Sequence, residues 1–221
     1  MRFAEAGAAT RAFRRRAGRR VVLLPVLCTA LAAAGAAACD PTTKSAATYA
    51  ERVAAQRREK DGFFRTGADS PIPSDRHAEF LPLAYFAIDE AYNAPAVLTP
   101  SEREPAMEMP TSAGLRRQMR RAGTLRFSLK GRPLQLTAFV EAEAADMNRL
   151  FVPFGDLTNG TETYAAGRYI DLERTVSGLY EVDFNRAYHP YCFYDPKYDC
   201  PYPPPENRLK LPIRAGERAR K

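Results

Sequence analysis

Hydrophobic and polar residues alternate along much of the chain after about Leu81. A period of two is typical of β-strands that bury one face and expose the other. The segments that we interpret as strands are 115–120, 124–129, 134–139, 149–154, 163–172, 179–184 and 209–213. Short strands separated by turns predict a mainly β fold, either an antiparallel β-sandwich or a barrel-like domain.

Turn-forming residues join two pairs of these strands. Lys130-Gly131 lies between segments 124–129 and 134–139, and it predicts a tight hairpin turn. Residues 156–160 join a second pair of strands, 149–154 and 163–172, through the turn residues Asn159-Gly160.

One helix is predicted before the strands, from about 45 to 60. Ser45 can cap its N-terminus, and the charges at 57–60 are typical of a face that water solvates. The stripe expected to face the protein contains Tyr49, Val53 and Gln56. We expect Phe63-Phe64 to anchor the end of the helix in the core, and 67–74 to form a loop.

The start of the chain has the three parts of a secretory signal: an arginine-rich region, the apolar stretch 21–38, and small residues before Cys39. We interpret Cys39 as the lipid-attachment site of a bacterial lipoprotein. The small residues 36–38 also fit an ordinary cleavage site, which would release a secreted soluble protein. The stretch has the minimum length for a membrane span, so an uncleaved anchor is a third interpretation.

These features divide the chain into four regions. They are a signal peptide (1–38), a lipidated tether (39–44), an N-terminal helix with its connection (45–66) and a mainly β domain (67–221). The part after the signal peptide has the size of one domain. We expect it on the extracytoplasmic side of a membrane of the bacterial cell envelope, with the membrane as a partner through the lipid.

Charge gives no support to nucleic-acid binding. The chain carries a formal net charge of +7, but seven arginines and one glutamate lie in 1–38. The remaining part therefore carries a net charge of only about +1, and the basic surface that nucleic acid requires is not expected.

The cysteines indicate a disulfide. Cys28 leaves with the signal peptide and Cys39 would carry the lipid, which leaves Cys192 and Cys200 in a compartment where disulfides persist. Free thiols are one alternative. A metal site that includes His189 is another. Because such a site has no evident fourth ligand, we expect no metal and no cofactor.

Residues 185–207, here called the aromatic loop, contain six tyrosines or phenylalanines, six prolines and both of these cysteines. Proline removes the hydrogen-bond donors that a central strand needs. The aromatic content argues against disorder. We therefore expect an ordered loop that wraps over the sheet and takes part in function.

Several blocks of the chain resemble the domain-of-unknown-function 1684 family. The blocks are 151–164, 167–171, 183–188, Cys192, Cys200-Pro201 and 204–207, with 60–64 and 70–71 as an opening motif. The resemblance implies export and a fold shared with that family, which is found largely in bacteria and whose biochemical role is not established. Where the family is expected to have asparagine, this chain has His189, which weakens a metal or general-base role for the histidine.

Polar residues gather near the predicted strand ends and the aromatic loop. The candidate set is Asp156, Thr158, Tyr164, Arg168, Asp183, Asn185 and Asn207. Such residues can form a ligand-binding site, or they can pair with one another and hold an irregular loop in place.

Two functions follow from these interpretations. The first is a non-enzymatic binding or envelope-associated module, with a glycan or a peptide as its ligand, because aromatic rings beside an arginine and amides suit both. The alternative is a hydrolase of an extracytoplasmic glycan or peptide that uses a carboxylate pair, with Arg168 holding an anion. The chain contains no G-x-S-x-G nucleophile elbow, no H-E-x-x-H motif and no phosphate-binding glycine loop, which favours the non-enzymatic module.

Overall fold

The computed structural model describes residues 46–102, 105–144 and 148–220. The predicted signal peptide, the tether, Cys28, Cys39 and the predicted cap Ser45 lie outside these residues. None of the helices in the described part combines the length and the apolar character that crossing a membrane requires.

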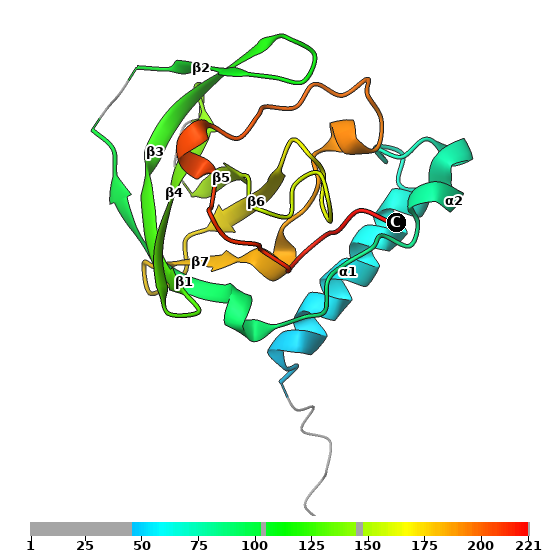
Figure 1. Cartoon of the computed structure of the whole chain (residues 1–221), viewed down its shortest axis with the longest axis horizontal. Helices are drawn as coiled ribbons and strands as arrows, with labels where there is room; N and C mark the ends of the chain where they lie inside the picture. Colours follow the sequence, from blue (N-terminus) through cyan, green and yellow to red (C-terminus); the bar gives the residue numbers. More distant parts are fainter. Residues whose placement is uncertain (1–45, 103–104, 145–147, 221) are drawn as a thin grey trace, which may run out of the picture. The chain divides into compact units, whose positions relative to one another are not determined.

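The described residues form a mainly β domain with seven strands in one antiparallel sheet (Figure 1). The strands are β1 (Asn93–Pro100), β2 (Met107–Pro110), β3 (Arg116–Leu129), β4 (Arg132–Glu141), β5 (Arg149–Phe154), β6 (Arg168–Glu173) and β7 (Tyr180–Asp183). The helices are α1 (Tyr49–Thr66) and α2 (His77–Phe80), with short 3-10 turns η1 (Ser74–Arg76), η2 (Glu90–Tyr92), η3 (Phe184–Arg186), η4 (Tyr191–Phe193) and η5 (Pro205–Asn207).

The sheet curves into a nearly closed barrel. Its strand order is β6-β5-β4-β3-β1-β7, with β2 paired to β3. The two outer strands are brought together by Tyr169 in β6 and Tyr188 just after β7, whose backbones exchange hydrogen bonds of 2.9 and 3.0 Å. The predicted barrel-like fold with one leading helix is confirmed.

The alternation in the sequence produces the barrel core because inward-facing side chains from successive strands meet in its interior. The fully buried members include Leu125, Leu136, Ala138, Leu150, Val152, Phe154, Val182 and Phe184. A smaller cluster joins α1 to the aromatic loop through Phe64, Ile72, Leu81, Leu83 and Tyr194.

The helix begins and ends later than predicted. Thr48 caps it, since its side chain accepts from the backbone of Glu51 while the Glu51 carboxylate accepts from the Thr48 backbone at 2.7 Å. This reciprocal cap stops the helix from starting at 45. The helix continues to Thr66, where burial of Phe64 stabilises its last turn, whereas Phe63 is 44% exposed and does not anchor it.

Four of the predicted strand segments differ from the structure. Segments 115–120 and 124–129 form the single strand β3, which bends at an irregularity between Arg121 and Gly123. Residues 163–167 turn instead of extending, so β6 begins at Arg168. Segment 209–213 is irregular chain despite its apolar residues, because it crosses the end of the barrel without pairing along a strand.

The hairpin prediction was correct. Lys130 and Gly131 have φ of 49° and 77° and connect β3 directly to β4. Two successive residues with positive φ are the geometry that matches the twist of a two-residue hairpin.

Candidate functional site

A buried ion pair lies at the start of β6. Arg168 donates from Nη2 to Oδ2 of Asp156 at 2.9 Å, and both side chains are fully shielded from solvent. The guanidinium also donates to the backbone carbonyls of Ile213, Ala215 and Glu217 at 2.7, 2.5 and 3.0 Å. Burial lowers the pKa of Arg168, and the charge of Asp156 opposes that shift. The arginine therefore fastens the C-terminal segment to the barrel.

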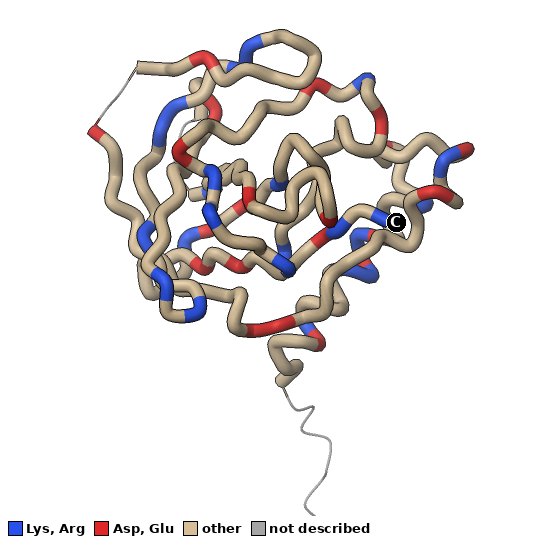
Figure 2. The backbone as a smooth tube through the Cα atoms, in the orientation of Figure 1, with Lys and Arg blue, Asp and Glu red and all other residues tan. Residues whose placement is uncertain are grey.

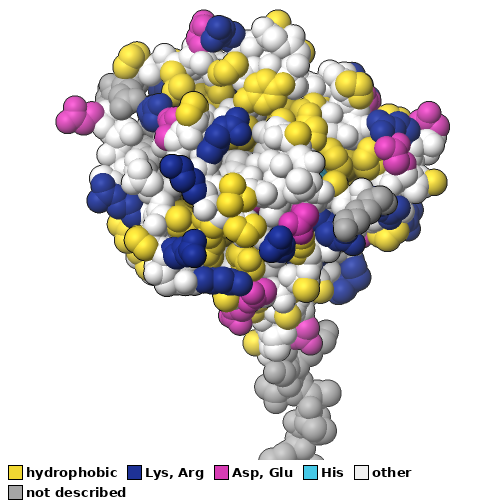
Figure 3. Space-filling model, in the orientation of Figure 1, with side chains coloured by type: hydrophobic (Ala, Val, Ile, Leu, Met, Phe, Trp, Pro, Cys, Tyr) yellow, Lys and Arg dark blue, Asp and Glu magenta, His cyan; other side chains and the backbone are white. Residues whose placement is uncertain are grey.

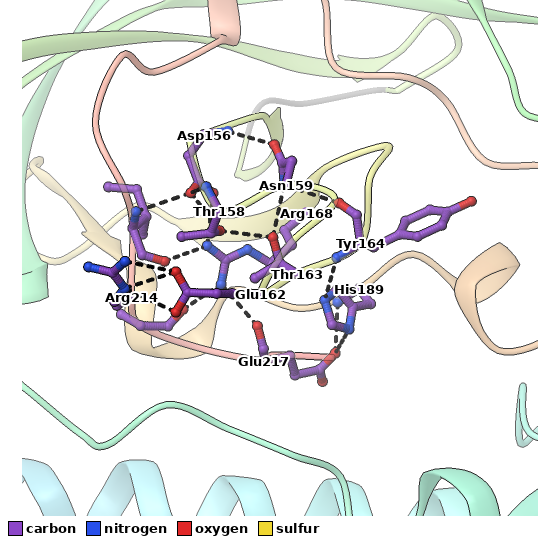
Figure 4. A network of polar contacts seen from close by, with 12 residues as sticks. Asp156, Thr158, Asn159, Glu162, Thr163, Tyr164, Arg168, His189, Arg214 and Glu217 are labelled. Carbon is purple, nitrogen blue, oxygen red and sulfur yellow. Dashed lines mark hydrogen bonds and ion pairs between the residues drawn. The ribbon is translucent and has the colours of Figure 1, made fainter. Parts of the chain in front are cut away.

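The turn after β5 completes this network (Figure 4). Oδ1 of Asp156 accepts from the backbone and the hydroxyl of Thr158 at 2.8 and 2.6 Å. Asn159 accepts from the backbone of Asp156 at 2.7 Å and donates to the carbonyl of Tyr164 at 3.1 Å. The Thr158 and Thr163 hydroxyls lie 2.9 Å apart. These groups make hydrogen bonds to one another and enclose the Asp156 carboxylate.

Glu217 is a buried acidic residue that sequence reasoning missed. Its carboxylate accepts from Nζ of Lys60 at 2.6 Å, from the backbone of His189 at 2.7 Å and from the Tyr194 hydroxyl at 2.8 Å. Burial alone raises the pKa of Glu217, but the charge of Lys60 and the hydrogen bonds from Lys60 and the His189 backbone outweigh it, so the pKa lies below its usual value. The Ala215-Gly216 pair before it was the only local sign of burial in an otherwise charged C-terminus.

Asp183 and Asn185 form a separate cluster that docks α1. Oδ1 of Asp183 accepts from the Tyr49 hydroxyl at 2.7 Å, and its other oxygen pairs with Arg186 at 3.1 Å. The Asn185 amide donates to the Tyr49 hydroxyl and to the Asp89 carbonyl, both at 2.8 Å. Burial and the hydrogen bond to Asp183 raise the pKa of Tyr49.

Asn207 forms a third cluster, inside the sheet. Its side chain accepts from the backbone of Thr137 at 2.7 Å and donates to the carbonyls of Thr137 and Pro153 at 2.8 and 2.7 Å. Because β4 and β5 share one register pair, Phe139 with Phe151, the amide bridges the place where the two strands separate. The seven predicted polar residues are thus divided among distinct networks.

His189 is enclosed beside Glu217. Its Nε2 accepts from the backbone of Tyr164 at 3.3 Å, its Nδ1 lies 3.7 Å from Glu217, and its ring packs 4.2 Å from that of Phe193. Burial lowers the pKa of His189 to about 4. Among the residues that the structure describes, no group of three or more His, Cys, Asp or Glu side chains is arranged to hold a metal ion.

Cys192 and Cys200 lie next to each other as free thiols. The backbone N–H of Cys192 donates to Sγ of Cys200 at 3.2 Å, and the Tyr164 hydroxyl lies 3.9 Å from Sγ of Cys192. The hydrogen bond from Cys200 lowers the pKa of Cys192 to about 6. The backbone of Cys200 is also held by the Ser112 hydroxyl at 3.0 Å, which ties the aromatic loop to the β2–β3 hairpin.

A pocket of about 710 Å³ lies between the outer face of the sheet and the aromatic loop; we call it the tyrosine pocket. Its aromatic lining comes from Phe139, Phe151, Tyr169, Tyr188, Tyr191 and Tyr198. Its charged lining comes from Lys60, Arg117, Glu141, Arg149, Asp171 and Asp199. None of the seven predicted polar residues lines it, whereas the aromatic loop does.

Part of the surface near this loop is apolar. In the space-filling view, hydrophobic side chains gather over the orange segment that Figure 1 assigns to the aromatic loop (Figure 3). Basic and acidic residues are interspersed along the described chain rather than separated by sign (Figure 2).

Comparison with known proteins identifies the family. The model of the family described as "Protein of unknown function (DUF1684)" matches residues 78–218. The chain belongs to the DUF1684 family. The matched part begins after α1 and includes Arg168, the aromatic loop and Glu217.

A solved structure is similar to this DUF1684 protein. It is the solution structure of an uncharacterized protein of Haloarcula marismortui, with 38% identity and a TM-score of 0.61, and the alignment covers 76% of this chain and 92% of that one. Comparison with curated proteins found no match.

The buried ion pair yields a stability prediction. Arg168→Met leaves the Asp156 carboxylate and three carbonyls unpaired, and we expect it to lower the free energy of unfolding by about 3–5 kcal/mol. Arg214→Met, which removes an exposed pair with Glu162, should cost less than about 1 kcal/mol. Urea unfolding followed by circular dichroism measures both variants. Equal losses in the two would contradict a structural role for Arg168.

His189 yields a pH prediction. Between about pH 6.5 and 4 the unfolded chain protonates this histidine while the folded protein does not, so stability falls as the pH falls through that window. The loss reaches roughly 3 kcal/mol by pH 4. His189→Asn lacks this titration. Urea midpoints at pH 7 and 4.5 should therefore separate more in the parent protein than in the variant; parallel profiles would contradict the enclosed, neutral histidine.

Proposed function

We propose that this DUF1684 protein is an exported, lipid-anchored binding module of the bacterial cell envelope and that the tyrosine pocket holds its ligand. The pocket carries the proposal. Its volume of about 710 Å³ lies in the range of small-molecule sites, and it combines aromatic walls with a few charged groups. A glycan or a peptide suits this lining.

The start of the sequence supports the location. The arginine-rich region, the apolar stretch 21–38 and Cys39 fit a lipoprotein signal, in which the lipid on Cys39 binds the membrane. A single acyl chain binds a membrane only weakly, and stable attachment takes a second signal. A lipoprotein carries more than one acyl chain, which is sufficient for stable attachment. The same proposal includes oxidation of the neighbouring Cys192 and Cys200 thiols to a disulfide after export, because oxidising compartments lie outside the cytoplasm.

The candidate carboxylates support binding more than hydrolysis. A general acid or base must reach the substrate and exchange a proton with it. Asp156 is enclosed by Arg168 and Thr158, and Asp183 is 3% exposed and held by Tyr49 and Arg186. Neither lines the tyrosine pocket. Two carboxylates that do line it, Glu141 and Asp171, are paired with Arg117 and Arg149. We therefore propose a non-enzymatic module.

Binding is tested at Tyr191, which lines the pocket and is 37% exposed. The chain has no tryptophan, so its intrinsic fluorescence reports the tyrosines. Titration with oligosaccharides and short peptides should change this emission, and Tyr191→Ala should weaken binding about tenfold, since an aromatic contact contributes about 1 kcal/mol or more.

Tyr202→Ala is the matched control, because Tyr202 is a tyrosine of the same loop, is 38% exposed and does not line the pocket. Its affinity should equal that of the parent protein. Equal effects of the two variants, or binding by neither ligand class, would refute the proposed site.

Location is tested at Cys39. Without the thiol no lipid can be attached, so Cys39→Ser should move the protein from the membrane fraction to the soluble extracytoplasmic fraction, or block its processing. A processed variant that stays in the membrane fraction would exclude lipidation.

The thiol state checks the compartment independently. In protein trapped with an alkylating reagent before any reduction, Cys192 and Cys200 should be unmodified. Reduction should then lower the free energy of unfolding by about 2.6 kcal/mol on the chain-entropy model. Alkylation of both cysteines without reduction would argue against the disulfide.

A further inference from the structure

We propose that the tyrosine pocket binds a neutral oligosaccharide. This inference rests on the proposed binding function and names the chemical class of its ligand. It follows from three properties of the pocket: fixed aromatic rings, cations that are already paired, and a β6 backbone that is already hydrogen-bonded at Tyr169.

The aromatic rings are held at fixed angles by one another. Tyr191 and Tyr198 pack edge to face with centroids 5.3 Å apart, and Tyr169 does the same with Tyr188 at 5.8 Å and with Phe151 at 4.7 Å. Sugar C–H groups carry a small positive charge and are attracted to the negative face of an aromatic ring. Rings that are already ordered bind such a surface with little loss of side-chain entropy.

The cations in the pocket are paired before any ligand arrives. The lining contains three cations and three carboxylates. The carboxylate partners are Glu217 for Lys60 at 2.6 Å, Glu141 for Arg117 at 2.8 Å and Asp171 for Arg149 at 3.0 Å. An anionic ligand would have to compete with these carboxylates for the cations, whereas a neutral ligand leaves all three pairs intact.

The ion pairs still have hydrogen-bonding capacity for hydroxyl groups. Oδ2 of Asp171 accepts from Arg149 and from the Tyr188 hydroxyl, both at 3.0 Å. A carboxylate has about four acceptor positions and a guanidinium five donors, so each retains sites that a hydroxyl can use. Arg149 is 72% exposed at its side chain and Asp171 is 30% exposed. A sugar hydroxyl both donates and accepts, and it can therefore bond to both members of the pair.

The backbone around the pocket favours a sugar over a peptide. Extended peptides usually bind by adding a strand to a free sheet edge. Here Tyr169 in β6 already exchanges both backbone hydrogen bonds with Tyr188, and the carbonyl of Pro110 in β2 accepts from the backbone of Tyr202 at 2.9 Å. Pro190 and Pro201, which also line the pocket, have no N–H to offer.

Calorimetric titration of the purified protein with defined probes tests the inference. The neutral probes are maltohexaose, cellohexaose and hexa-N-acetylchitohexaose; the charged probes are a galacturonic acid hexamer and acidic and basic hexapeptides. At least one neutral hexasaccharide should bind more tightly than every charged probe. Its Kd should change less than about twofold over a tenfold increase in salt concentration, because no net charge is neutralised on binding.

Asp171→Asn tests the ion pair between Arg149 and Asp171 directly. The substitution leaves Arg149 without its carboxylate partner, so the affinity for the neutral hexasaccharide should fall about tenfold while the galacturonic acid hexamer binds more tightly than it does to the parent protein. Asp195→Asn is the matched control, because Asp195 also pairs with a cation at 3.0 Å but lies in the aromatic loop outside the pocket. This control should bind both probes as the parent protein does.

The outcomes separate the inference from the function on which it rests. Binding of a peptide, but of no saccharide, with loss in Tyr191→Ala would overturn the neutral sugar and keep the binding module. Tighter binding of the acidic hexamer by the parent protein, with steep salt dependence, would do the same. If no probe binds in a manner sensitive to Tyr191, both proposals are wrong.

Discussion

A guanidinium group without access to water determines how the last part of this chain is placed. Arg168 is fully buried, and its charge is compensated by Asp156 and by three carbonyls of the C-terminal segment. A buried charge is costly unless it is paired and hydrogen-bonded, and both terminal nitrogens of this guanidinium donate while its buried Nε does not. Irregular chain supplies these carbonyls better than a strand would, because its carbonyls need not point into a ladder.

The same C-terminal segment positions Glu217, and through it the helix and the aromatic loop. Gly216 has a φ of 76°, and a Cβ there would lie 2.5 Å from the Ala187 carbonyl and 2.6 Å from that of Phe184. Only glycine allows this approach. One residue later, Glu217 binds Lys60 of α1 together with His189 and Tyr194 of the aromatic loop. Lys60 in turn lies 4.7 Å from the ring of Tyr188, at the wall of the tyrosine pocket.

Burial separates the polar groups into two kinds. Arg168, Asp156 and Asn207 are enclosed and use their hydrogen bonds on the protein itself, which makes them structural. Arg149 and Asp171 pair at the surface of the pocket and keep capacity for a ligand. Residue type does not distinguish these two situations, since both contain an arginine beside an aspartate. Solvent access does, and it depends on what the rest of the chain covers.

The sequence by itself determined the local features of this protein. Alternating hydrophobic and polar residues specify strands, Lys130-Gly131 specifies a hairpin, and the prolines of the aromatic loop exclude a central strand there, because each follows from backbone geometry or residue chemistry over a few positions. It also identified Arg168 and Asp156, but as members of one polar set with Asp183 and Asn207. Only the tertiary structure divided that set, placed Tyr169, Arg149 and Asp171 in the pocket and buried Glu217. These outcomes depend on strand register and on contacts between residues more than a hundred positions apart, such as Lys60 with Glu217, for which local pattern carries no signal.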